Sequence, residues 1–306
     1  MQNENEIPVV LIAGPTASGK SALATALARE FDGVIVNADA MQVYEPLRVL
    51  TARPSVEDEA QAPHRLYGHV AGAEAYSVGR YLKDAAVELS GDRMPIFVGG
   101  TGLYFRSMEK GIAEIPEPDP KVRAYYRNKR AWALHEELER RALEEAARLL
   151  PTDSQRLARA LEVLESSGHP LGYYYEKAQG EALLNGRRVI RIYLEPEREL
   201  LYSRINARFS QMLKAGALDE VSALLAQGLD AELPVMKAIG VPELAAFLAG
   251  NTSIEEAERL SAQNTRHYAK RQMTWARSNM IAWEFQIAQF SEKERAKIFA
   301  FIRKKG

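Results

Sequence analysis

Short apolar runs and longer amphipathic stretches follow one another in the first third of the chain. Apolar runs cover residues 8–13, 34–36 and 95–98, and a helical spacing of apolar positions covers 21–31 and 76–89. Short continuous apolar runs are typical of strands that are buried on both faces of a parallel sheet. The alternation therefore predicts an α/β domain, in which ligands bind at the carboxyl ends of the strands.

The pattern changes after residue 111. Three prolines between residues 115 and 120 indicate a linker, and residues 121 to 179 carry a nearly continuous helical pattern rich in Ala, Leu, Glu and Arg. A further strand is predicted at 188–194, and helices are predicted at 197–215, 217–227 and 254–280. We therefore expect an α/β core with C-terminal helices from residues 1–111 and 185–306, interrupted by an all-helical insertion at 112–184.

Composition and charge narrow the function classes. The 306 residues include no cysteine, which excludes disulfides, thiolate zinc sites and a cysteine nucleophile. No apolar run approaches the ~20 residues of a membrane span, and the polar, acidic start lacks a signal-peptide pattern, so we expect a cytoplasmic protein without a membrane partner. The net charge of −1 does not favour general nucleic-acid binding, but two basic stretches can bind phosphates locally. One contains Lys121, Arg123, Arg127, Lys129 and Arg130 with no acid among them, and the other contains Arg266, Lys270, Arg271 and Arg277.

The strongest motif lies between the first predicted strand and the first predicted helix. It is the phosphate-binding loop G-x-x-x-x-G-K-[ST], formed by Gly14, Pro15, Thr16, Ala17, Ser18, Gly19, Lys20 and Ser21. Its glycines let the backbone wrap around phosphate oxygens, and the helix N-terminus adds the positive end of its dipole. Lys20 can neutralise phosphate charge, and the Ser21 hydroxyl can ligate Mg²⁺. The motif predicts a P-loop NTPase-like sheet with flanking helices, but it does not identify the phosphate compound.

Polar residues also follow the second and third predicted strands. Asp39 can bind Mg²⁺ through water or act as a general base toward an amine or hydroxyl, although a lone aspartate at this place more often caps a turn. Gly99, Gly100 and Gly102 surround Thr101. They permit the close approach of a ligand or of another chain segment, or simply form a tight turn between strand and helix.

Two more patterns lie in the predicted C-terminal helices. Arg204 and Arg208 are four residues apart on one helix face, where they can clamp a diphosphate or simply face solvent. Residues 265–275 interleave basic residues with Tyr268 and Trp275. This pattern suits stacking on nucleic-acid bases as well as it suits an amphipathic helix with a buried aromatic face. His64 has no second ligand at metal spacing, so we expect a structural role for it.

Taken together, these segments resemble the bacterial tRNA dimethylallyltransferases, which prenylate N6 of an adenosine beside the anticodon. The resemblance covers nearly the whole chain, in the order of the family. The matching segments are 14–21, 39–44, 62–66, 98–104, 153–163, 208–216, 236–240 and 265–275. The resemblance implies transfer of a dimethylallyl group from dimethylallyl diphosphate to N6 of adenosine 37 of tRNA, with release of diphosphate and with Mg²⁺ as cofactor. We further expect a monomer.

The resemblance also implies roles for individual residues. Residues 16–21 would bind the diphosphate, with Ser21 near Mg²⁺. Asp39 matches the general base that takes a proton from the N6 amine, and Thr101 matches the threonine of the reaction channel. Arg208 matches an arginine that contacts the diphosphate, so that Lys20, Arg208, Mg²⁺ and backbone amides would stabilise the leaving group.

Contacts with tRNA are implied for two stretches and two further positions. The two stretches contain Asp39, Ala40, Met41 and Gln42, and Asp153, Ser154, Gln155, Arg156 and Leu157; the further positions are Thr101 and Arg123. The insertion would hold the anticodon stem, and the target base must leave its stack.

The chain departs from the usual family pattern at three places. Residues 49–54 are V-L-T-A-R-P where the family commonly has I-G-T-A-K-P, and residues 150–153 are L-P-T-D in place of H-P-N-D. Val241 and Pro242 stand where a tyrosine followed by a basic residue is common. These departures leave the residues of the predicted chemistry unchanged and bear on the contacts with tRNA.

Three alternatives use parts of the same pattern. A small-molecule kinase and a prenyltransferase acting on a free adenylate would both need the phosphate loop. A catalytically silent RNA-binding protein would not need the intact set of Lys20, Ser21, Asp39, Thr101 and Arg208. The helical insertion and the basic-aromatic segment favour a large nucleic-acid substrate over a small acceptor.

Overall fold

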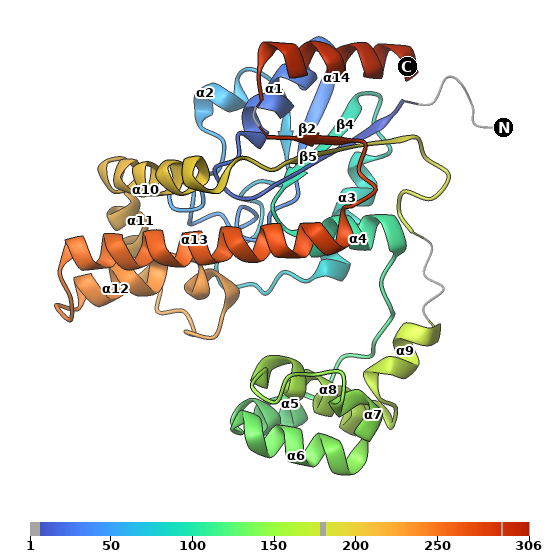
Figure 1. The fold of residues 1–306 in the computed structure, drawn as a ribbon. Coiled ribbons are helices and arrows are strands. Elements are labelled where there is room, and N and C mark those ends of the chain that lie inside the picture. Colours follow the sequence, from blue (N-terminus) through green and yellow to red (C-terminus); the bar gives the residue numbers. More distant parts are fainter. Residues whose placement is uncertain (1–6, 178–181, 289, 306) are drawn as a thin grey trace. The chain divides into compact units, whose positions relative to one another are not determined.

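The computed structural model describes residues 7–177, 182–288 and 290–305 (Figure 1). The chain divides into two compact units, unit 1 with Met1–Glu109 and Leu183–Gly306, and unit 2 with Lys110–Ala182. The end of the predicted helical pattern at Gln179, and residues 1–6 of the predicted polar start, lie outside the described residues. No helix in the described part of the chain is long and apolar enough to cross a membrane.

Unit 1 is built on a parallel sheet with the strand order β3-β2-β4-β1-β5-β6. The strands are β1 (Val9–Ala13), β2 (Gly33–Asn37), β3 (His64–Arg65), β4 (Met94–Gly99), β5 (Val189–Leu194) and β6 (Phe285–Ile287). The predicted α/β class and parallel sheet are thereby confirmed. The hydrophobic pattern does not predict β3 or β6, because strands of two and three residues are too short to show a period.

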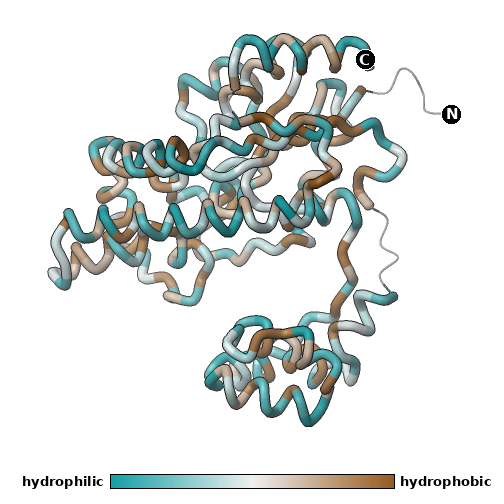
Figure 2. Tube along the Cα trace, viewed as in Figure 1, coloured by the Kyte–Doolittle hydropathy of each residue, from teal (hydrophilic) through white to brown (hydrophobic). Residues whose placement is uncertain are grey.

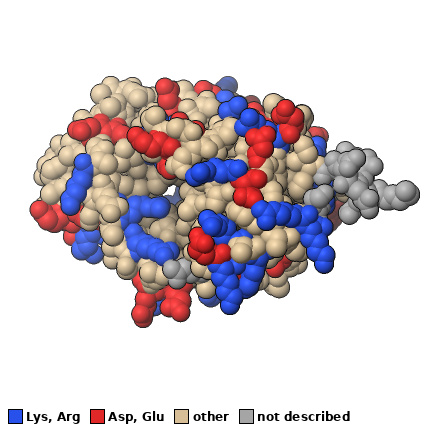
Figure 3. All heavy atoms as spheres, turned by 90° about the horizontal axis from the view of Figure 1, so that it is seen from above, with Lys and Arg blue, Asp and Glu red and all other residues tan. Residues whose placement is uncertain are grey.

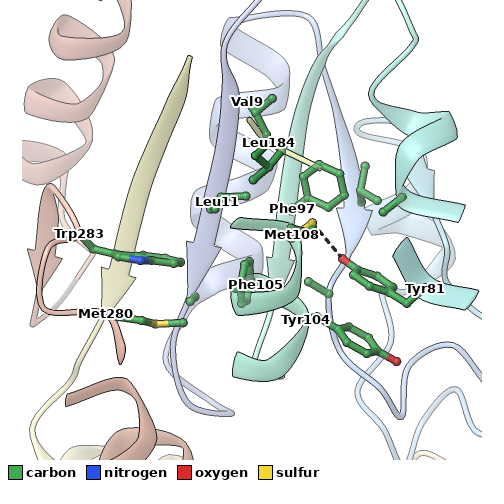
Figure 4. Packing of buried hydrophobic residues seen from close by; sticks show 14 of the residues in the cluster. Val9, Leu11, Tyr81, Phe97, Tyr104, Phe105, Met108, Leu184, Met280 and Trp283 are labelled. Atoms are coloured by element: carbon green, nitrogen blue, oxygen red, sulfur yellow. Dashed lines mark hydrogen bonds between the residues drawn. The ribbon is translucent and has the colours of Figure 1, made fainter. Parts of the chain in front are cut away.

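Helices cover both faces of this sheet, so its central strands β1, β2 and β4 are buried and mostly apolar (Figure 2). Side chains alternate between the faces along β1, because successive residues of a strand point to opposite sides. Val9 and Leu11 pack with α3 (Val78–Glu88) and α4 (Gly102–Lys110), as Figure 4 shows. Val10 and Ile12 pack with α1 (Lys20–Glu30) and α14 (Glu292–Lys305) on the other face.

The remaining helices of unit 1 form a further apolar cluster, separate from those on the two faces of the sheet. They are α10 (Arg198–Lys214), α11 (Ala217–Leu225), the 3₁₀ turn η1 (Pro234–Lys237), α12 (Val241–Leu248) and α13 (Ile254–Asn279), and the short α2 (Val56–Glu59) lies in the connection from β2 to β3. The loop after β2 packs on this cluster through Tyr44, Leu47 and Leu50.

Two of the departures from the family pattern meet in this cluster. Leu50 and Val241 are both buried in it. Gly240, which precedes Val241, has a φ of +99°, and a Cβ built on it would lie 2.6 Å from Cδ1 of Leu50. Leu50 therefore occupies the space that the absent side chain of Gly240 leaves.

Unit 2 is all-helical and has an apolar core of its own. Its helices are α5 (Pro120–Arg127), α6 (Ala131–Arg141), α7 (Leu143–Ala146), α8 (Ser154–Ser167) and α9 (Leu171–Lys177). Tyr126, Leu134, Leu138, Leu157 and Leu161 form the centre of this core. The helix α5 begins as its sequence suggests, with Asp119 as N-cap and Pro120 in the first turn.

A single carboxylate anchors the loop between β2 and α2 to the helices of unit 1. Glu220 of α11 accepts hydrogen bonds from three successive backbone N–H groups, those of Arg48 (2.8 Å), Val49 (2.7 Å) and Leu50 (3.0 Å). This loop continues from the segment that contains Asp39, so the anchor fixes the connection on which Asp39 lies.

We expect Glu220→Ala to lower the free energy of unfolding of unit 1 by about 2–4 kcal/mol, because hydrogen bonds to a charged acceptor are strong and three donors lose their partner together. Urea unfolding followed by the fluorescence of Trp275 and Trp283, both in unit 1, measures this change. The matched control is Glu232→Ala, which removes a carboxylate paired only at the surface with Lys237 and should leave the midpoint unchanged. Equal midpoints for the two variants would contradict the anchoring role.

Candidate active site

The phosphate loop connects the end of β1 to the start of α1. Ala17 and Gly19 adopt left-handed backbone conformations, with φ of 63° and 94°. Residues of this kind alternate with right-handed ones in the backbone nests that bind anions. The loop lies close against β5, because a Cβ on Gly14 would be 2.7 Å from the carbonyl oxygen of Leu194. The hydroxyl of Ser18 is buried and has no hydrogen-bond partner among the described residues.

Two half-buried cationic side chains lie beside this loop. The Lys20 ammonium donates to the carbonyl oxygens of Gly14 (2.9 Å) and Pro15 (2.7 Å). Burial lowers the pKa of Lys20 to about 7; the carboxylate of Asp39 opposes this shift, and the positive charge of Arg208 adds to it. Burial also lowers the pKa of Arg208. Among the described residues, no carboxylate forms an ion pair with either side chain, so both charges are available to an anion.

Apolar contacts hold the helix of Arg208 against the phosphate loop. Leu201 and Ile205 of α10 pack with Ala17 of the loop and with Met273 of α13. Arg208 follows Ile205 on the same helix, and its charge acts on Lys20. Arg204, its predicted partner, is half-buried one turn earlier. The structure therefore brings Lys20 and Arg208 together from two elements far apart in the sequence.

Asp39 lies at the carboxyl end of β2, in a tight local network. Its backbone N–H donates to Oδ1 of Asn37 (2.9 Å), and its own Oδ1 accepts from the backbone N–H of Met41 (2.9 Å). The aspartate thus makes the turn contact that the simpler interpretation predicts, while its charge also acts on Lys20. The turn contact is therefore confirmed, and the role of Asp39 as a base or Mg²⁺ ligand stays a prediction.

Thr101 links the end of β4 to the segment of Asp39. Its hydroxyl oxygen accepts from the backbone N–H of Ala40 (3.0 Å), and its own N–H donates to the carbonyl oxygen of Ala38 (3.3 Å). The carboxyl ends of β1, β2 and β4 therefore bring Lys20, Asp39 and Thr101 to one edge of the sheet, as parallel strands should.

The glycines around Thr101 allow other parts of this chain to approach. A Cβ on Gly99 would lie 1.9 Å from the carbonyl oxygen of Ala38, and one on Gly102 would lie 2.3 Å from the ring of Trp275. Trp275 is on α13, and a second side chain of that helix, Gln272, packs against Gly100. The predicted basic-aromatic segment is therefore a helix that packs with its aromatic face against the loop after β4.

The negative charge of Asp39 acts on three nearby tyrosines. Burial raises the pKa of Tyr67, Tyr104 and Tyr268, and the negative charge of Asp39 raises each pKa further. Their hydroxyls consequently stay protonated and can donate hydrogen bonds over the physiological pH range. Tyr104 stacks on Tyr81, with ring centroids 3.8 Å apart, which holds its ring in place. Residue-type patterns give no signal for Tyr67 or Tyr104, because an isolated tyrosine is compatible with any core.

The remaining predicted residues of this region have structural contacts. Gln42 donates from Nε2 to the carbonyl oxygens of Thr51 (2.9 Å) and Ala52 (3.0 Å). Ala40 and Met41 are half-buried, and Met41 packs on the apolar cluster of α11 and α12. Nδ1 of His64 donates to the carbonyl oxygen of Ala62 (2.9 Å). The described residues contain no group of three or more His, Asp or Glu that could hold a metal ion by themselves.

Acidic side chains lie beside the basic cluster of unit 2, residues 121–130. Arg123 and Arg127 lie 3.9 and 3.6 Å from the carboxylate of Glu162, which is almost fully buried in α8. Lys129 lies 2.7 Å from Glu137 of α6. Residues 121–130 contain no acid, but acids more distant in the sequence lie beside these three residues in the folded unit.

The second predicted tRNA stretch begins α8. Asp153 caps the helix by accepting from the N–H of Arg156 (3.1 Å), while Ser154, Gln155 and Arg156 are exposed. Leu157 is fully buried in the core of unit 2, so its side chain packs within the unit and does not form part of a surface.

Charges of both signs are interspersed on the face of the molecule seen in Figure 3. This distribution agrees with the net charge of −1.

Comparisons with known proteins agree with the resemblance. The profile described as IPP transferase matches residues 42–279, and one described as isopentenyl transferase matches residues 7–71. A tRNA dimethylallyltransferase of Bradyrhizobium sp. (strain ORS 278) is 51% identical over 284 residues, which cover 90% of this chain and 92% of that protein. One from Methylorubrum populi is 50% identical over 284 residues, covering 90% and 89%.

Solved structures share the fold. The tRNA isopentenylpyrophosphate transferase of Bacillus halodurans is 31% identical with a TM-score of 0.70, over 98% of this chain and 96% of that one. A eukaryotic dimethylallyltransferase described as acting on tRNA has a TM-score of 0.82 at 24% identity, over 98% and 80% of the two chains. With half of its sequence identical to these curated relatives, the chain belongs to the IPP transferase family, together with the tRNA dimethylallyltransferases.

Proposed function

We propose that the protein transfers a dimethylallyl group from dimethylallyl diphosphate to N6 of adenosine 37, next to the anticodon of tRNA, and releases diphosphate. The family membership supports dimethylallyl transfer to tRNA as the reaction. The acceptor atom and the residue roles are proposals that rest on the site.

The observation that carries the proposal is the pair of half-buried cations beside the phosphate loop. Lys20 and Arg208 have no carboxylate partner among the described residues, and each loses solvation by burial. A diphosphate between them would compensate both charges. Ser18, whose buried hydroxyl lacks a partner, would donate to a phosphate oxygen. Negative charge that develops on the leaving diphosphate as the carbon–oxygen bond breaks would be stabilised by the same groups.

The acceptor side of the reaction is assigned to the neighbouring strand ends. Asp39 would take a proton from the N6 amine as the nitrogen attacks the allylic carbon. The effect of its charge on Lys20 supports a base beside the proposed diphosphate site. Thr101, whose hydroxyl oxygen holds the N–H of Ala40, would keep the segment of Asp39 in place and line the channel between donor and acceptor.

Mg²⁺ fits this site as a cofactor that binds together with the diphosphate. Ser21 opens α1 with an exposed side chain, and its hydroxyl would be one ligand. Mg²⁺ typically uses one or two protein ligands, substrate phosphate oxygens and water, so the lack of a larger carboxylate group among the described residues is compatible with it. When bound, the ion would lower the charge of the leaving group.

The helical unit 2 supplies the proposed surface for the anticodon stem. Its exposed residues Ser154, Gln155 and Arg156 lie at the start of α8, and its arginines Arg123 and Arg127 are half-exposed although Glu162 is near them. Phosphate contacts by such arginines would supply affinity without sequence preference.

We propose that the protein acts in the cytoplasm and as a monomer.

A small-molecule kinase would use the same phosphate loop, so the bond that breaks separates the two functions. We expect the protein, in the presence of Mg²⁺ and without ATP, to convert dimethylallyl diphosphate and tRNA to free diphosphate and tRNA that carries an N6-prenylated adenosine. Mass spectrometry of nuclease-digested tRNA measures the product, and AMP offered in place of tRNA tests the free-adenylate alternative. Unmodified tRNA together with ADP formation from ATP and a small acceptor would establish the kinase instead.

Substitution of the proposed base tests the chemistry directly. We expect Asp39→Ala to slow prenyl transfer in the ternary complex by ~10²–10⁴-fold, the usual contribution of a general base. Affinity for tRNA should change little, since the carboxylate contributes one contact at most. Single-turnover rates and filter binding give the two quantities, and a rate close to that of the unchanged protein would remove Asp39 from the mechanism.

The lowered pKa of Lys20 predicts a pH dependence for diphosphate binding. Its ammonium is charged below pH 7 and neutral above it, and a bound anion raises its pKa again. Affinity should therefore be greatest below pH 7 and fall by up to about tenfold per pH unit as the pH rises above it. Calorimetric titration with inorganic diphosphate between pH 6 and pH 9 measures the slope.

The control for this titration is Lys20→Met, which retains only the slope caused by the protons of diphosphate itself. Deprotonation of diphosphate strengthens binding as the pH rises, so the affinity of the unchanged protein should fall relative to that of Lys20→Met between pH 7 and pH 9. Identical slopes would mean that Lys20 does not titrate in this range.

A further inference from the structure

One side chain of α13 joins two loops of the site. Oε1 of Gln272 accepts from the backbone N–H of Thr16 (3.0 Å), in the phosphate loop. Nε2 of the same amide donates to the carbonyl oxygen of Gly100 (2.9 Å), in the loop after β4. β1 and β4, the strands that end at these loops, are neighbours in the sheet. The amide of Gln272 therefore spans the carboxyl ends of two adjacent strands.

The chemistry of the contact requires an amide at this position. A carboxamide is the side-chain group that offers a neutral acceptor and a neutral donor on one small plane, so it can serve an N–H and a carbonyl oxygen at once. Gly100 is part of the fit, because a Cβ there would lie 2.1 Å from Nε2 of Gln272. The glycine is needed for the approach of the helix, and not for a turn with positive φ.

The neighbouring turns of α13 extend this contact toward the acceptor side. Tyr268 lies one turn before Gln272, and the side chains of Thr101 and Gln272 near its hydroxyl lower its pKa, against the larger effect of burial. Thr101 in turn holds the N–H of Ala40, next to Asp39. A series of neighbouring groups thus leads from Thr16 to Gln272 and, through Tyr268 and Thr101, to the segment of Asp39.

We propose that Gln272 is a positioning residue that fixes the distance between the diphosphate loop and the loops of the acceptor side. The inference rests on the proposed function, in which the leaving group binds at the first and the attacking amine at the second. Gln272 touches neither reacting atom in this proposal. Its contribution is alignment, and a displacement of about 1 Å between reacting groups can cost about 10²-fold in rate.

Gln272→Met tests the proposal, because methionine keeps the length of the side chain and lacks both hydrogen-bonding groups. We expect the single-turnover rate of the ternary complex to fall by ~10–100-fold, while dissociation constants for inorganic diphosphate and tRNA stay within about threefold. The matched control is Gln263→Met, a glutamine of the same helix whose amide contacts only Arg259 among the described residues. Its rate should equal that of the unchanged protein.

A double-mutant cycle keeps the test meaningful if Gln272→Met folds poorly. Gly100→Ala alone should slow the reaction, because the added Cβ displaces the amide. With Gln272→Ala already present that clash is absent, so the same glycine change should then have little further effect, and the two changes should not be additive. Additive effects, or an unchanged rate for Gln272→Met, would overturn the positioning role.

The outcome is separable from that of the proposed function. If the unchanged protein forms no prenylated adenosine, the proposed function fails. If it forms the product and the substitutions reduce rate and both affinities in proportion to a loss of folded protein, Gln272 is structural and this inference fails.

Discussion

The site depends on two half-buried positive charges that lie close together, those of Lys20 and Arg208. Removing a cation from water costs several kcal/mol, and Lys20 and Arg208 also repel one another. The fold opposes this cost with apolar contacts at a distance from the charges: Leu201 and Ile205 hold α10 against Ala17 of the phosphate loop. Stability supplied elsewhere thus maintains an arrangement that a bound anion would stabilise, which is the usual relation between a scaffold and its site.

The same arrangement explains why the phosphate loop can serve reactions of different kinds. The loop and its lysine recognise phosphate oxygens, and they carry no information about the group that is transferred. In the proposed function, that information comes from the other strand ends, where Tyr67, Tyr104 and Tyr268, with protonated hydroxyls, lie near the carboxylate of Asp39. The proposal therefore assigns the choice of reaction to β2, β4 and α13, more than to the phosphate loop.

Sequence patterns predicted the parts of the structure that depend on local order. The apolar runs of β1, β2 and β4 and the phosphate loop are contiguous, so period and spacing suffice to find them. Contacts between distant segments gave no such signal. The pairing of Lys129 with Glu137, the clustering of arginines at Glu162 and the bridge from Gln272 to Thr16 each depend on how helices pack. The resemblance implies a tRNA contact for Leu157, but this side chain is fully buried in the core of unit 2.

The packing of Leu50 on Gly240 has a consequence for how such chains diverge. A leucine at position 50 is possible only because position 240 offers no side chain, and Val241 closes the same space. Either position changed alone would leave a void or an overlap in a close-packed cluster, both of which are unfavourable. Drift in this part of the molecule should therefore proceed by compensating pairs, and the lineage that carries Leu50 should keep a small residue opposite it.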